Sequence, residues 1–347
     1  MDAFTGLLII AHKFVIKLLI FVGYCLFYYA FLIPIAAVPA THQEYKIWKS
    51  TPTPLNFCSI IKVYVFNVLW FVFSYIGSLL LLPIWASRGF ADGSIEKEAH
   101  LVVEKLVAKG LLLSFLGPVE VRGEEHIPPI RIEGVDFNGT KESLPVAPVF
   151  IANHCSSIDS AVVYVPLRRF KWIAKQSIKI IPGPGTIMSM SRHIFIQRKG
   201  GKGKQGQDKK SSVLNLYEQA NAAIQAGIPM MIFPQGTRRM SQKLPFKDGA
   251  FNIAMNNESV IVPISINIPP GIWNTWYPLN LLWSNSRANG NECTNKIILT
   301  IHEGIPTKHD MDKEELKKRT QDIIYSCLPP LYHGTNGKIK EEPKKSK

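Results

Sequence analysis

Cysteine is scarce in this sequence, and its scarcity argues against a secreted domain held together by disulfides. The chain has 347 residues and five scattered cysteines, which are Cys25, Cys58, Cys155, Cys293 and Cys327. An odd number without clustered spacing predicts neither a disulfide framework nor a paired metal site, and it fits a reducing compartment. We therefore expect no metal ion and no bound cofactor.

Internal repeats, nucleic-acid-binding modules and the GxxxxGK[ST] spacing of a phosphate loop are also missing. The last absence bears on residues 199–210, KGGKGKQGQDKK, which we interpret as a flexible solvated loop rather than a nucleotide site. The formal net charge is nevertheless +14. Without a nucleic-acid module, this charge indicates anionic lipid headgroups and phosphorylated substrates.

Charged residues are absent from two long apolar runs, Leu18–Ala40 and Val63–Ser87. Each run exceeds the ~20 residues that a helix needs to cross a bilayer. The sequence therefore predicts an N-terminal membrane helix pair within residues 1–90, either as two crossings or as a hairpin dipping into one leaflet. A cleaved signal peptide and a pair of buried core helices are the alternatives, although signal peptides usually carry only ~7–15 apolar residues.

The remaining chain alternates short apolar runs with helical patterns, which is typical of an α/β sheet covered on both faces. We predict a mostly parallel twisted sheet in an α/β domain at residues 91–330, followed by a basic tail at 331–347. The expected strands are Val119–Val121, Val146–Ile151, Phe170–Ala174, Ile194–Gln197, Pro229–Phe233, Val260–Ile268 and Lys296–Ile301. Helices are expected at 213–227 and at 312–328.

The strongest local motif is Asn153-His154-Cys155-Ser156-Ser157-Ile158-Asp159, directly after the second expected strand. Loops at the carboxyl ends of parallel strands are where α/β sheets place ligand sites. The spacing matches a capping box with Ser156 as N-cap and Asp159 at the third helical position. Asp159 could then accept from one nitrogen of His154 and leave the other nitrogen basic. Alternatively, Asp159 only caps the helix and His154 is a turn residue.

Two further strand ends carry arginine, in Ile194-Phe195-Ile196-Gln197-Arg198 and in Phe233-Pro234-Gln235-Gly236-Thr237-Arg238-Arg239. Arginine in such places suits phosphate binding, and a glycine turn lets the backbone approach an anion. Solvated basic strand ends are the alternative. A fourth segment, Val262-Pro263-Ile264, places proline in an apolar strand, where it indicates an edge or a bulge.

Together these four motifs resemble the glycerolipid acyltransferase family, which includes the 1-acylglycerol-3-phosphate (lysophosphatidic acid) acyltransferases. The resemblance covers Val119 to Pro306, and the NH-x4-D motif followed by FPxGTR is highly specific in combination. It implies that His154 is the catalytic base and Asp159 its orienting partner. It also implies an acceptor-binding set of Arg198, Gln235, Gly236, Thr237 and Arg238. The Pro263 strand would help to shape the acyl-donor site.

Two positions depart from the family pattern, because Gln235 stands where the family usually has glutamate and Gln197 where it usually has aspartate. Both departures bear on the acceptor more than on the reaction. The last four residues, Lys344 to Lys347, resemble a di-lysine retrieval signal of the endoplasmic reticulum, with a plain charged tail as the alternative. A cytosolic catalytic domain on that membrane agrees with two crossings.

The function that follows from this resemblance is acyl transfer from acyl-CoA to the sn-2 hydroxyl of 1-acyl-sn-glycerol-3-phosphate, giving phosphatidic acid. Acyl-CoA is a co-substrate, and the expected partners are lysophosphatidic acid and membrane lipids, without nucleic acid. Acylation of glycerol-3-phosphate or of another lysophospholipid is the first alternative. A catalytically inactive membrane protein that binds anionic lipids is the second.

Overall fold

The computed structural model describes residues 3–32, 35, 57–79, 99–115, 119–129, 146–155, 158–167, 169–196, 206–238, 243–268, 273–274, 277–278 and 296–333. Its centre is a seven-stranded sheet. The strands are β1 (Val119–Arg122), β2 (Val149–Ala152), β3 (Lys171–Lys175), β4 (Ile194–Ile196), β5 (Met230–Ile232), β6 (Ile261–Asn267) and β9 (Ile297–Ile301). A separate pair, β7 (Trp273–Asn274) and β8 (Tyr277–Pro278), makes a two-stranded sheet.

The strand order is β1-β9-β6-β2-β5-β3-β4, and every neighbouring pair is parallel except β6 with β9. The predicted mostly parallel sheet is thus confirmed, as are all seven expected strands. Central strands read as continuous apolar runs because helices cover both faces. Val149, Phe150 and Ile151 of β2 are completely buried.

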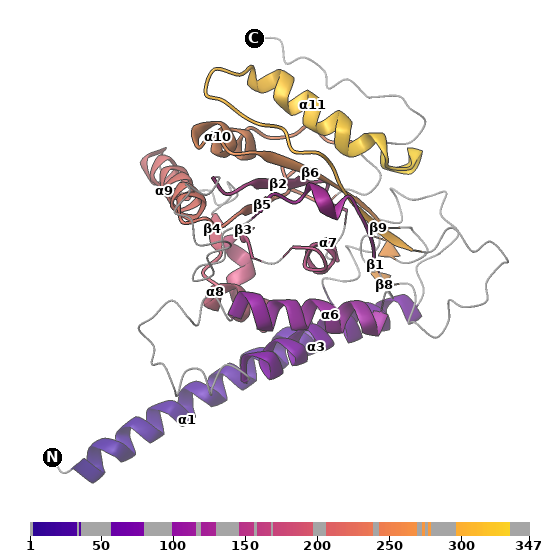
Figure 1. Ribbon diagram of the computed structural model, residues 1–347. Coiled ribbons are helices and arrows are strands. Elements are labelled where there is room, and N and C mark those ends of the chain that lie inside the picture. The colour runs from indigo at the N-terminus through magenta and orange to yellow at the C-terminus, as the bar shows by residue number, and fades with distance from the viewer. Residues whose placement is uncertain are drawn as a thin grey trace.

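Helices form a layer on each side of the sheet (Figure 1). One layer holds α3 (Phe57–Leu79), α6 (Lys105–Phe115), α7 (Asp159–Val163) and α8 (Pro184–Met190); the other holds α10 (Gly249–Asn256) and α11 (Lys313–Ser326). Asp312 caps α11 by accepting from the backbone N–H of Glu314 at 2.8 Å. This helix lies within the predicted range 312–328.

The helix α9 (Gly206–Gln225) begins earlier than the sequence indicated. The predicted flexible loop at 199–210 is therefore wrong for residues 206–210, which are helical. Apart from Gly206, the residues there are Gln207, Asp208, Lys209 and Lys210. Polar residues of this kind are compatible with the solvated face of a helix, so a polar composition does not exclude one.

The predicted pair of membrane helices is wrong in number. Within the described part of the chain, only Ala11–Leu32 is long and apolar enough to cross a membrane; it comprises α1 (Ala3–Phe27) from Ala11 onward and the π-helix η1 (Tyr28–Leu32). In α3, a shorter apolar stretch, Val68–Leu79, packs against the α/β domain instead. Phe73, for example, packs against the hydrophobic core, and its ring lies beside Gly110 of α6. Composition alone does not separate a helix facing lipid from one facing protein.

The sequence indicated that Pro263 lies on an edge strand or at a bulge. The edge interpretation is wrong. Strand β6 lies between β2 and β9, and Pro263 pairs with Ile151 of β2. Its carbonyl accepts from the N–H of His302 at 2.9 Å, just past the end of β9. Proline is tolerated here because regular pairing with β9 begins only at Ile264.

Candidate active site

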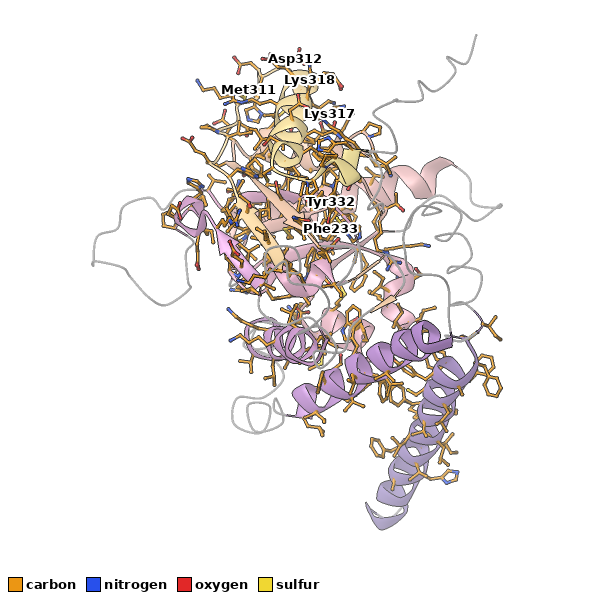
Figure 2. The ribbon with its side chains drawn as sticks, turned by 90° about the vertical axis from the view of Figure 1, so that its right-hand side faces the viewer. Phe233, Met311, Asp312, Lys317, Lys318 and Tyr332 are labelled. Atoms are coloured by element: carbon orange, nitrogen blue, oxygen red, sulfur yellow. The ribbon has the colours of Figure 1, made fainter. Side chains whose placement is uncertain are left out.

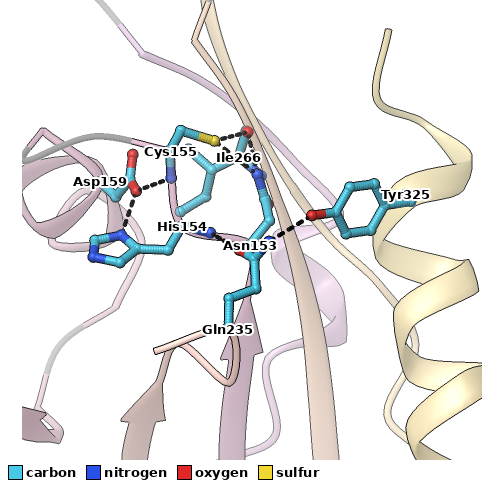
Figure 3. Close-up of polar contacts among 7 residues, drawn as sticks. All are labelled: Asn153, His154, Cys155, Asp159, Gln235, Ile266 and Tyr325. Carbon is cyan, nitrogen blue, oxygen red and sulfur yellow. Dashed lines mark hydrogen bonds and ion pairs between the residues drawn. The ribbon is translucent and has the colours of Figure 1, made fainter. Parts of the chain in front are cut away.

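The turn after β2 is fixed to the neighbouring strand β6 by Asn153. Its side chain is 1% exposed; Oδ1 accepts from the N–H of Ile266 at 2.8 Å, and Nδ2 donates to the carbonyl of Ile266 at 2.9 Å. The side-chain amide thus makes the same pair of hydrogen bonds to Ile266 that the backbone of a neighbouring strand would make. It sets the position from which His154 leaves the sheet (Figure 3).

His154 and Asp159 are in contact, as the sequence predicted. Nδ1 of His154 lies 2.7 Å from Oδ2 of Asp159, and the same oxygen accepts from the backbone N–H of Cys155 at 2.6 Å. The carboxylate is fully buried, whereas the histidine side chain keeps 21% of its surface exposed. An Nδ1–H donated to the carboxylate leaves Nε2 with a free lone pair, which is the arrangement of a general base.

The predicted register of the capping box differs from the observed one. Helix α7 begins at Asp159 itself, with Ile158 at the cap position, and Ser156 lies outside the described residues. The carboxylate still reaches back to a backbone N–H before the helix, the one on Cys155. This second bond orients the carboxylate toward His154.

An aromatic stack supports the imidazole from one side. The ring of His154 lies flat on Phe233, with centroids 4.1 Å apart and planes inclined by 6°, and Phe233 in turn stacks on Trp172 at 5.3 Å. Phe233 follows β5 and Trp172 lies in β3, so the two strands adjoining this part of the sheet supply the support. The stack fixes the plane of the imidazole ring.

Gln235 connects the turn after β2 to helix α11. Its Oε1 accepts from the backbone N–H of His154 at 2.7 Å, and its Nε2 donates to the hydroxyl of Tyr325 in α11 at 2.8 Å. The residue is 2% exposed. Figure 3 shows Gln235 between these two groups, so its amide makes its hydrogen bonds inside the protein.

The other predicted acceptor-binding residues are placed only in part. Gly236 has φ +68°, a left-handed conformation that favours glycine, and its N–H donates to the carbonyl of Phe233 at 3.0 Å. Thr237 is exposed and Arg238 half-buried directly after it. Arg198 and Gln197 lie outside the described residues. Because β2, β4 and β5 are parallel, their carboxyl ends meet at the same edge of the sheet.

Cys155 is a structural thiol. It is 1% exposed, and its Sγ accepts from Nδ2 of Asn153 at 3.0 Å. Burial, together with the nearby Asp159 carboxylate, raises the pKa of this thiol well above its ordinary value. A neutral, enclosed thiol is no nucleophile, in agreement with the preference for the histidine.

Sequence reasoning missed four residues that shape the site, Asn153, Trp172, Phe233 and Tyr325. Asn153 and Phe233 stand inside motifs that were recognised, so the signal was present but their roles were not. Trp172 and Tyr325 belong to other elements, β3 and α11. No local pattern in the sequence points from either residue to His154.

Parts of this chain are similar in sequence to known acyltransferases. Residues 118–267 match the family described as Acyltransferase. The 1-acyl-sn-glycerol-3-phosphate acyltransferase of Chlamydomonas reinhardtii is 25% identical over 307 residues, which cover 86% of this chain and 78% of that protein. The alpha form from Mus musculus is 30% identical over 216 residues, covering 60% of this chain and 65% of its own length. The solved lysophosphatidic acid acyltransferase PlsC from Thermotoga maritima aligns with a TM-score of 0.48 and 21% identity, covering 76% of this chain and 95% of its own.

Proposed function

We propose that this chain, whose residues 118–267 match the family described as Acyltransferase, makes phosphatidic acid. In this proposal it transfers a fatty acyl group from acyl-CoA to the sn-2 hydroxyl of 1-acyl-sn-glycerol-3-phosphate. The names of the relatives from Chlamydomonas reinhardtii and Mus musculus support the choice of acceptor. The observation that carries it is the 2.7 Å contact between His154 Nδ1 and the buried carboxylate of Asp159.

The reaction we infer is direct transfer without an acyl-enzyme. Nε2 of His154 takes the proton of the acceptor hydroxyl while its oxygen attacks the thioester carbonyl. The tetrahedral adduct then expels the CoA thiolate, which recovers the proton from the imidazolium. The buried Asp159 carboxylate stabilises that imidazolium and keeps Nε2 directed away from itself. Positioned base catalysis of this kind contributes on the order of 10²–10⁴-fold.

Gln235 acts in this proposal as a positioning residue and not as an acceptor ligand. Both ends of its amide are hydrogen-bonded inside the protein, to the His154 N–H and the Tyr325 hydroxyl. An amide supplies an acceptor and a donor, so this position does not need the usual glutamate to hold the turn. Arg198, Gly236, Thr237 and Arg238 remain the residues proposed for the acceptor phosphate.

We also propose that the chain is anchored through Ala11–Leu32 with a cytosolic catalytic domain at the endoplasmic reticulum. The apolar helix supports the anchor. The boundaries proposed for the parts of the chain are 1–90 for the membrane-associated part, 91–330 for the α/β domain and 331–347 for the tail.

The experiment is a CoA-release assay on the purified full chain with a panel of acceptors. Lysophosphatidate should be acylated in preference to glycerol-3-phosphate and lysophosphatidylcholine. His154→Ala should abolish release, whereas His309→Ala, a change at an exposed histidine, should retain it. Activity retained by His154→Ala would refute the role of the base. Lack of CoA release with every acceptor would refute the enzymatic proposal and favour the lipid-binding alternative.

A further inference from the structure

Three tyrosines tie one segment of the α/β domain to the N-terminal helices. The hydroxyl of Tyr24 donates to the carbonyl of Ile180, and that of Tyr29 donates to the carbonyl of Pro182 at 2.9 Å. From α3, the hydroxyl of Tyr75 accepts from the N–H of Gly183 at 3.4 Å. These bonds hold the 3₁₀ helix η4 (Gln176–Ile180) and the turn after it against α1, η1 and α3.

The contact with α1 sets the depth of η4 relative to a bilayer. In Figures 1 and 2 the N-terminal part of α1 projects away from the body of the protein. Farther along the same helix, Leu19 is 65% and Ile20 66% exposed. Tyr24 and Tyr29 lie near the other end of the span Ala11–Leu32. Tyrosines gather at membrane–water interfaces, so the segment bonded to them lies at headgroup level.

The exposed side chains at η4 suit the level of the lipid headgroups. Ile180 is 64% exposed, and Lys179 beside it is exposed with its Nζ 4.7 Å above the ring of Phe195. Lys175, at the end of β3, is exposed as well. Between Asp159 and Asp208 the chain has ten lysines and arginines and no acidic residue. An apolar side chain flanked by cations, with no compensating acid in the surrounding sequence, fits an anionic lipid surface.

We propose that η4 is a membrane-docking element that enters the headgroup layer of an anionic leaflet. Ile180 inserts between the lipids, and Lys175 and Lys179 bind their anionic headgroups. This second contact, together with α1, fixes the orientation of the α/β domain on the bilayer. The inference rests on the proposed anchoring through Ala11–Leu32 but not on the acyl-transfer chemistry.

The test places an NBD fluorophore on Ile180→Cys of the full chain in lipid nanodiscs, with Leu214→Cys as the matched control. Leu214 is a similarly exposed apolar residue, at 59%, but it lies on α9. The background carries serine at Cys58, Cys293 and Cys327. Interfacial insertion places a side chain ~5–10 Å into the headgroup region, within reach of a shallow lipid nitroxide.

The fluorophore at position 180 should emit at shorter wavelength, be quenched by the lipid nitroxide and be protected from aqueous iodide. At position 214 it should be quenched by iodide. Adding phosphatidylserine to neutral nanodiscs should move the fluorophore at position 180 deeper into the bilayer and leave the one at position 214 unchanged. Iodide quenching at 180 equal to that at 214 would overturn the docking. Iodide protection without nitroxide quenching would also overturn it, since protein would then cover the site. Identical emission in neutral and anionic discs would overturn the role of headgroup charge.

Discussion

Replacing Asp159 with asparagine isolates the charge of the dyad from its geometry. Two donors, His154 Nδ1 and the Cys155 N–H, converge on the single atom Oδ2 at 2.7 and 2.6 Å. An asparagine oxygen in the same place can accept from both, so the turn should keep its shape while the carboxylate charge is lost. Two unit charges about 4 Å apart attract by about 4 kcal/mol at an effective dielectric constant of 20.

That attraction exists only when the imidazole is protonated, as it is during the transfer in the mechanism proposed above. Its loss should raise the barrier by about 4 kcal/mol, which corresponds to about 10³-fold in rate. The assay is CoA release in detergent at saturating acyl-CoA and lysophosphatidate, with thermal unfolding of both proteins as the control for folding. A variant that folds normally and works within about tenfold of the parent would refute the reasoning, because the missing attraction would then be under about 1.4 kcal/mol.

Three further predictions concern neighbouring residues. Cys155→Ser should stay active, and native Cys155 should resist maleimide, because its thiol is enclosed and neutral. Tyr325→Phe should cost about 1–3 kcal/mol of unfolding free energy in denaturant titrations, because Gln235 Nε2 loses that acceptor. Burial, and secondarily the charge of His126, lower the pKa of His302 below its ordinary 6.5. The unfolded chain then binds that proton more readily, so thermal stability should fall as the pH drops below about 6.5, and His302→Gln should flatten this dependence.

The sheet was predictable because it is covered on both sides. Strands such as β2 and β6 are apolar at nearly every position, which makes them visible as short runs between turns. The contact of His154 with Asp159 was predictable for a related reason, since a turn and a helix start five residues apart form one local unit.

The remaining features depend on tertiary context. An apolar helix such as α3 has the same composition whether lipid or protein surrounds it, so its packing against α6 could not be deduced. The start of α7 at Asp159 instead of two residues earlier also lay beyond the pattern, because the capping-box spacing does not fix the register. The bond from Gln235 to Tyr325 joins residues 90 positions apart, and although Gln235 stands in a recognised motif, nothing in the sequence points from it to Tyr325.

That last bond has a consequence for the order in which the protein matures. The motif residues from Asn153 to Arg238 are all synthesised before α11, yet the amide behind His154 finds its hydroxyl partner only when position 325 has been added and packed. A nascent or truncated chain that ends before Tyr325 therefore contains all four acyltransferase-like motifs, while the turn after β2 lacks its connection to α11. The site is therefore fully hydrogen-bonded only after α11 has packed against it, although α11 contains none of the four motifs.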